Sequence, residues 1–83
     1  MPARKFVKMS YYAAFREAAG RSEESLESAA RTAADLYDEV ARLHGFIFDR
    51  STLRVVLNDT IVPWSSEVRD GDTVVFLAPF AGG

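Results

Sequence analysis

The last two residues of the chain, Gly82 and Gly83, are those whose type and position most directly suggest chemistry. Glycine has no Cβ, so two successive glycines can pass in extended form through a channel too narrow for any other residue. A terminal glycine also leaves its carboxylate open to activation by ATP in the active site of a partner. The alternative is a frayed chain end, since termini are often small and disordered. We favour the chemical interpretation because the pair directly follows a strongly apolar segment.

The segment before the glycines, residues 73–80, is apolar or proline at seven of its eight positions. It is rich in β-branched and aromatic residues, which predicts a strand, and the turn Asp70-Gly71-Asp72 marks its start. A strand without polar alternation is usually buried on both faces. Pro79 ends the pairing because it has no N–H group to donate. The sequence therefore predicts a buried strand that leads directly into the two glycines.

These residues also carry a family resemblance. The turn, the apolar strand and the ending Ala78-Pro79-Phe80-Ala81-Gly82-Gly83 resemble the sulfur carriers of the ubiquitin-like β-grasp superfamily. The match is closest to the small subunit of molybdopterin synthase (the MoaD-like family), followed by the thiamine sulfur carriers (ThiS-like). Ala78 stands where the first of two prolines is usual, and Phe80 stands where valine is common. Neither change touches the diglycine.

The resemblance implies a function for Gly83. A ubiquitin-activating-type adenylyltransferase would adenylate its carboxylate with ATP, and sulfur transfer would leave a C-terminal thiocarboxylate. The large subunit of molybdopterin synthase, in a heterotetramer, would then receive the tail, with Pro79, Phe80 and Ala81 against it and Gly82 in its channel. The sulfur would pass to the pterin precursor of the molybdenum cofactor. On this interpretation the chain binds no cofactor or metal and is the sulfur-donor subunit, while its partners catalyse.

Three other functions stay open at this stage. A thiamine-type sulfur carrier shares the chemistry of the tail. A ubiquitin-like modifier would instead form an isopeptide bond between Gly83 and lysines of target proteins. A β-grasp adaptor would have a tail with no chemical role.

The composition limits the class of protein. Eighty-three residues predict one domain over residues 1–83, with a flexible tail at residues 79–83. The net charge of −2, with interspersed acids and bases, argues against nucleic-acid or anionic-membrane partners. There is no cysteine, so disulfides and thiolate metal sites are excluded, and any sulfur must be carried elsewhere. No apolar signal core follows the basic residues 1–5, so we expect a cytoplasmic protein.

The first half of the chain predicts a strand, a short helix, a weak second strand and a longer helix. Residues 6–12 alternate in polarity, with Val7, Met9 and Tyr11 on one side and Phe6, Lys8, Ser10 and Tyr12 on the other. Residues 13–20 form a helical turn that ends at Gly20. Residues 22–34 are ambiguous, because their Ala, Glu and Arg content favours one long helix over residues 22–44. Thr32 and Asp35, however, nearly form a capping box, so we predict a weak strand at residues 24–27 around Leu26 and a helix at residues 33–43.

Further positions follow from helical and strand spacing. The helix places Ala33, Leu36, Val40 and Leu43 on its buried face, pairs Asp38 with Arg42, and ends at Gly45. His44, in the last turn, is predicted to have a structural or surface role.

Residues 46–48 are predicted to plug the core. Residues 53–57 form a strand, and Asn58-Asp59 turns the chain into a hairpin with residues 60–62. Residues 63–68 form a loop or a single helical turn.

This order of elements, together with the resemblance, predicts an α+β fold. We expect a ubiquitin-like β-grasp with a mixed four- to five-stranded sheet packed on one main helix, the last strand being parallel to the first. One helix covers one face only. Val74 and Phe76 then point to the core, and Val75 and Leu77 point outward with Tyr12 and Ile61. An exposed apolar patch of this kind usually marks a binding site.

Overall fold

The computed structural model describes residues 4–78. The five strands are β1 (Lys5–Ser10), β2 (Glu23–Ser28), β3 (Arg54–Leu57), β4 (Thr60–Val62) and β5 (Thr73–Leu77). The helices are α1 (Ala13–Ala19), α2 (Ala33–His44) and a 3₁₀ turn, η1 (Arg50–Thr52). The predicted tail at residues 79–83 lies outside the described residues.

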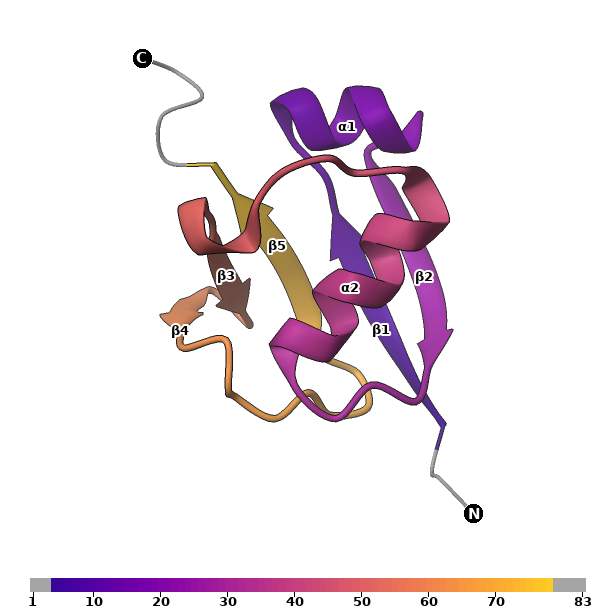
Figure 1. Ribbon diagram of the computed structural model, residues 1–83. Helices are drawn as coiled ribbons and strands as arrows, with labels where there is room; N and C mark the ends of the chain where they lie inside the picture. Colours follow the sequence, from indigo (N-terminus) through magenta and orange to yellow (C-terminus); the bar gives the residue numbers. More distant parts are fainter. Residues whose placement is uncertain (1–3, 79–83) are drawn as a thin grey trace.

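The strands form one sheet in the order β2-β1-β5-β3-β4. β5 pairs in parallel with β1, and the other neighbouring strands are antiparallel. α2 crosses one face of the sheet, and α1 lies at the end where β1 and β5 both finish (Figure 1). The predicted β-grasp is therefore confirmed, with five strands and one main helix, and with the short helix α1 after the first strand.

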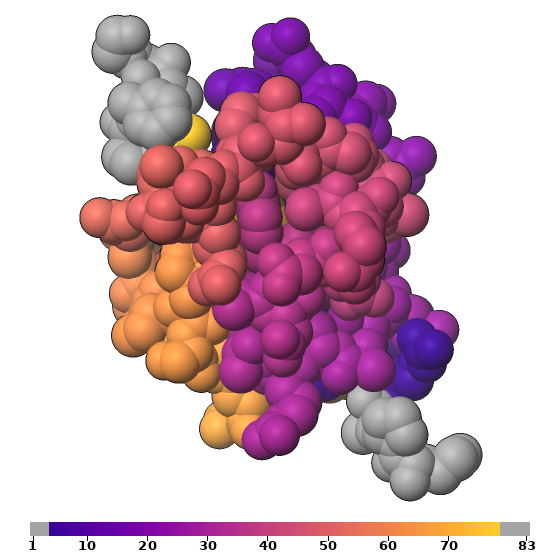
Figure 2. All heavy atoms as spheres, viewed as in Figure 1, coloured from indigo at the N-terminus to yellow at the C-terminus, as the bar shows by residue number. Residues whose placement is uncertain are grey.

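The core lies between α2 and the covered face of the sheet. Its central side chains are Val7, Met9, Leu36, Leu53, Val55 and Phe76, all 2% exposed or less. Full burial of such a side chain contributes about 1.5–3 kcal/mol. In the view of Figure 2, α2 and the segment after it lie on the near side of the molecule.

The helix α2 begins and ends as predicted but buries a different face. Thr32 Oγ1 accepts a hydrogen bond from Asp35 N (3.2 Å), and Gly45 ends the helix with a φ of 72°. Tyr37 is buried, whereas Leu43 is 58% exposed, so the placement of Leu43 on the buried face is wrong. At about 100° per residue, His44 falls roughly 20° from Ala33 while Leu43 falls about 80° away, so His44 continues the buried stripe.

Three further predictions of burial and pairing need correction. The core plug at residues 46–48 is wrong for Ile47, which is 92% exposed, because Phe46 and Phe48 alternate inward around it. The last strand is not buried on both faces, since one main helix covers only one of them. Within the described part of the chain, Asp38 and Arg42 form no ion pair.

The Asp70-Gly71-Asp72 turn fixes the start of β5. Asp72 accepts hydrogen bonds from Arg69 N and from the Asn58 amide, both at 2.8 Å, and the Asn58 oxygen accepts from Thr73 N at 3.0 Å. Gly71 has a φ of 88°, which L side chains rarely adopt. The turn before β5 is therefore tied to the β3–β4 hairpin.

Replacing Asp72 with alanine should lower the free energy of unfolding by about 1–3 kcal/mol, because two hydrogen bonds to a charged acceptor are lost. Urea unfolding followed by circular dichroism measures this change. Glu27→Ala is the matched control, since Glu27 is exposed and has no polar partner among the described residues. Equal stability of the two variants would contradict the role given to Asp72.

A nearly buried polar cluster joins β1, β2 and α2. Glu24 Oε2 lies 2.7 Å from the Tyr11 hydroxyl and 2.6 Å from His44 Nε2, and the side chains of Glu24 and His44 are 9% and 12% exposed. Burial raises the pKa of Glu24, but the hydrogen bonds from His44 and Tyr11 outweigh it and lower the pKa overall. Burial, with the Glu24 hydrogen bond, raises the pKa of Tyr11. Glu24 is thus an anion held by two donors, which confirms a structural contact for His44.

This cluster predicts a pH dependence of stability. The folded pKa of Glu24 lies below its unfolded value, so its contribution is fully present above the unfolded pKa and is lost as pH falls through the folded one. Glu24→Gln should cost about 1–2 kcal/mol at pH 7, because charge-assisted hydrogen bonds become neutral ones. The difference in melting temperature from wild type should shrink between pH 6 and pH 3. A difference that is constant with pH would contradict the role of the carboxylate.

Candidate functional site

The face of the sheet opposite α2 is open and has an apolar centre. Val75 on β5 pairs with Val56 on β3, and Val56 pairs with Ile61 on β4. Since side chains alternate between the faces, these three project side by side away from the core. Leu77 follows two residues after Val75 on the same face. We call Val56, Ile61, Val75 and Leu77 the open-face patch.

The structure places Ile61, Val75 and Leu77 on this face, and it places Tyr12 near the C-terminal end of β5. Ile61 and Tyr12 are 63% and 58% exposed, and Val75 and Leu77 are partly exposed, while Val74 and Phe76 are buried. The predicted orientation of β5 is therefore confirmed. Pro79, Phe80, Ala81, Gly82 and Gly83 lie outside the described residues.

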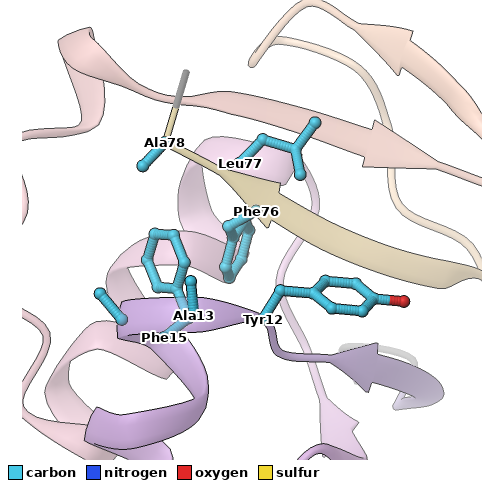
Figure 3. Close-up of a pocket in the computed structure, with 7 residues that line it drawn as sticks. Tyr12, Ala13, Phe15, Phe76, Leu77 and Ala78 are labelled. Carbon is cyan, nitrogen blue, oxygen red and sulfur yellow. The ribbon is translucent and has the colours of Figure 1, made fainter. Parts of the chain in front are cut away.

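A small apolar pocket of about 110 Å³ lies beside the C-terminal end of β5. Figure 3 shows Phe15 of α1 and Phe76 of β5 directed toward one another, with the Tyr12 hydroxyl pointing away. The centroids of the two phenylalanine rings are 6.1 Å apart. Among the described residues, the lining consists of Tyr12, Ala13, Ala14, Phe15, Phe76, Leu77 and Ala78. An apolar side chain of a partner could therefore contact the domain where the chain leaves β5.

The wall of this pocket includes a strained residue. Ala13 has a φ of 50°, in the left-handed region that non-glycine residues seldom occupy. Contacts on both sides hold it there: Tyr11 is fixed by Glu24, and Phe15 packs against Phe46 with centroids 5.1 Å apart. Tyr12 is thereby directed to the surface beside Leu77.

The geometry of residues 4–78 supplies a binding surface. Within residues 4–78 there is no group of acidic or histidine side chains that could hold a metal ion. Of the described residues that line the pocket, Tyr12 alone is ionisable. The chemistry that this arrangement can support is the docking of a partner protein.

Sequence reasoning missed one residue of the open-face patch. Val56 lies at its centre, between Val75 and Ile61. Phe6 is exposed on β1, on the side of that strand predicted for it. The alternation within residues 53–57 could have identified Val56, because Leu53, Val55 and Leu57 are its buried neighbours on the strand. The pocket could not have been found this way, since it depends on how α1 meets β5.

No helix within residues 4–78 has the length and apolar character needed to cross a membrane.

The chain matches known proteins in both sequence and fold. Residues 9–83 match the ThiS family. A candidate molybdopterin converting factor subunit 1 from Pyrococcus furiosus is 31% identical, covers 87% of this chain and 94% of its own, and has a TM-score of 0.73. Small archaeal modifier protein 1 from Methanosarcina acetivorans is 19% identical over 98% of this chain and 99% of its own, with a TM-score of 0.76.

A more distant similarity extends to ubiquitin. The ubiquitin of Caldiarchaeum subterraneum is 18% identical over 98% of this chain and 100% of its own, with a TM-score of 0.64. This likeness and that to the archaeal modifier show the fold alone. No curated protein matches the chain. Because the family match spans residues 9–83, the chain belongs to the ThiS family of ubiquitin-fold sulfur carriers.

Proposed function

We propose that this protein is the sulfur-carrier subunit of a molybdopterin synthase and that Gly83 is the last residue of its functional chain. The observation that carries the proposal is the family match, which runs through Gly82 and Gly83. The molybdopterin branch is supported by the 31% identity to the Pyrococcus furiosus protein, whose name refers to molybdopterin conversion.

The proposed chemistry takes place at one carboxylate. A carboxylate is a poor electrophile, so a ubiquitin-activating-type adenylyltransferase joins it to AMP and releases pyrophosphate. A sulfur donor then displaces AMP and leaves a thiocarboxylate on Gly83. Two glycines without side chains let this group enter a narrow channel in each partner.

The domain contributes the surface that places the tail. The open-face patch is apolar at its centre, with Arg54 beside Leu77 at the edge nearest the tail. In the proposed complex the large synthase subunit and the adenylyltransferase bind this face in turn, and an apolar side chain of the partner enters the pocket beside α1. Residues 79–83 then span the distance from Ala78 to the reacting centre.

A conjugating role is the second candidate function, favoured by the fold that the chain shares with archaeal modifier proteins. The two functions require the same activation of Gly83 and differ in the nucleophile that follows. Intact mass spectrometry separates them. A carrier gains the mass difference of one oxygen-to-sulfur exchange, whereas a modifier forms branched peptides on lysines of other proteins.

Deletion of Gly83, or addition of one alanine after it, should abolish thiocarboxylation and leave the melting temperature unchanged, because neither change touches the core of residues 4–78. The measurement is the intact mass after incubation with ATP, the adenylyltransferase and a sulfur donor. An extended variant that gains sulfur without losing its added residue would refute the role of Gly83.

Leu77→Glu should weaken binding to the large synthase subunit at least tenfold, equivalent to about 1.4 kcal/mol, because a charge would be buried in an apolar interface. Phe80→Ala should have a similar effect. Leu43→Glu is the matched control, since Leu43 is an exposed leucine on α2, on the opposite side of the molecule. Calorimetry giving Leu77→Glu the wild-type affinity would show that the partner does not bind the open face.

A further inference from the structure

The open face of the sheet is divided into an apolar half and a charged half. One row of paired residues crosses all five strands, beginning with Glu23 on β2, Ser10 on β1 and Val75 on β5. Val75 pairs in turn with Val56 on β3, and Val56 pairs with Ile61 on β4. Paired residues project their side chains from the same face. The row therefore runs from an exposed carboxylate at the β2 edge into the apolar open-face patch.

A cation borders the patch at the C-terminal end of β5. Arg54 is exposed on β3 and lies opposite Leu77. Its Nη1 donates a hydrogen bond to the carbonyl oxygen of Leu53 at 3.1 Å, and among the described residues the guanidinium forms no ion pair. A guanidinium has five N–H donors in a planar fork that matches the two oxygens of a carboxylate. Arg54 is thus placed to bind a carboxylate that comes from outside the described chain.

The opposite half of the open face is net negative. Glu23 and Glu27 project from β2, and within residues 4–78 neither forms an ion pair. Lys8 projects from β1 on the same face, but it lies opposite Ser25 and is therefore diagonal to both carboxylates. Two carboxylates and one ammonium leave these two strands with one net negative charge on this face. A cation of a partner would be attracted to this side of the patch.

Arg54 and Glu23 are too far apart to neutralise each other. They are separated by three strand spacings of about 4.8 Å and two residue steps of about 3.3 Å, or about 16 Å in all. Salt screens exposed charges over about 8 Å at physiological ionic strength. Each charge therefore acts mainly on the groups that bind beside it, with Val75 and Leu77 of β5 between the two.

We propose that Arg54 and Glu23 fix the orientation of the partner that docks on the open face. The partner presents apolar side chains to the open-face patch, a carboxylate to Arg54, and a lysine or arginine to Glu23. The inference rests on the proposed function, in which the large synthase subunit binds this face, and it states the chemistry of the surface by which that subunit binds.

The charges supply what the apolar patch lacks. Burial of apolar surface is non-directional, so the patch alone does not fix how the partner is rotated about it. Half a turn of the partner in the plane of the face would bring its carboxylate to Glu23 and its cation to Arg54, and like charges in an interface repel. One orientation is therefore favoured. The proposed chemistry requires this, because the tail that follows β5 must enter one channel of the partner.

Charged residues on an edge strand such as β2 also prevent pairing with other sheets, and either sign of charge can do so. Reversal of the sign distinguishes that role from partner recognition. Calorimetry measures the affinity for the large synthase subunit of the full chain as wild type, Arg54→Glu, Glu23→Lys and the double variant. Measurements are made at about 0.1 M and about 1 M salt, where the screening lengths are about 10 Å and about 3 Å.

Two charge reversals on α2 are the matched controls. Arg42→Glu and Asp38→Lys change the net charge by the same amounts as the two open-face substitutions. Both residues are exposed on the helix that covers the opposite face of the sheet. Circular dichroism of every variant confirms folding.

We expect each single reversal on the open face to weaken binding by at least about fivefold at the lower salt, because attraction becomes repulsion. The controls should stay within about twofold of wild type, and the losses of affinity should shrink at the higher salt. The double variant has the wild-type net charge, and we expect it to bind no better than the weaker single variant. It would repel the partner at both charged positions.

Two results would overturn the inference and leave the proposed function in place. Wild-type affinity of both single variants would show that the charges do not contact the partner. Recovery of wild-type affinity in the double variant would show that only the net charge matters. A large subunit that does not bind the wild-type chain would instead contradict the proposed function, and this inference with it.

Discussion

The parallel pairing of β1 with β5 is the constraint on which the rest of the structure depends. Parallel neighbours need a crossover connection, and the long segment between these strands, with α2, fills that role. The pairing places β5 in the middle of the sheet, where its buried residues Val74 and Phe76 anchor it. It also sends the ends of β1 and β5 to the same edge, so that α1 packs beside the last described residues. The residues after β5 thus follow the central strand of the sheet, whose side chains Val74 and Phe76 are buried.

A second constraint is the number of helices. One main helix covers one face of a five-stranded sheet, and the opposite face must be polar or have a partner. Val56, Val75 and Ile61 form a continuous apolar row there through consecutive strand pairs. In a domain of this size such a row adds nothing to the core. Its position next to the strand that carries the tail links the uncovered surface to the proposed chemistry.

Much of this could be predicted from the sequence where the signal is local. Thr32, Asp35 and Gly45 marked the ends of α2, and the alternation in β5 separated Val74 and Phe76 from Val75 and Leu77. The errors came from tertiary contacts. Leu43 was placed inward because the apolar spacing did not anticipate that His44, bound to Glu24, would continue the buried stripe. Ile47 was placed inward because an apolar run does not show which of its residues will point to solvent. The pocket depends on the meeting of α1 with β5, two elements more than fifty residues apart, and no local pattern specifies that contact.

The distribution of positive charge fits the chemistry proposed for the tail. A protein with an activated carbonyl at its end benefits from positive charges that are not nucleophiles, and arginine meets that requirement better than lysine. Arg54 lies at the edge of the open face beside Leu77, next to the exit of the chain, and Arg16 lies in the last turn of α1. Both lysines lie on β1, with Lys5 at its start, away from that exit, and Lys5 is held by backbone carbonyls. The end of β5 therefore has an arginine directly beside it, while Lys8 lies beside Thr73 at the start of that strand.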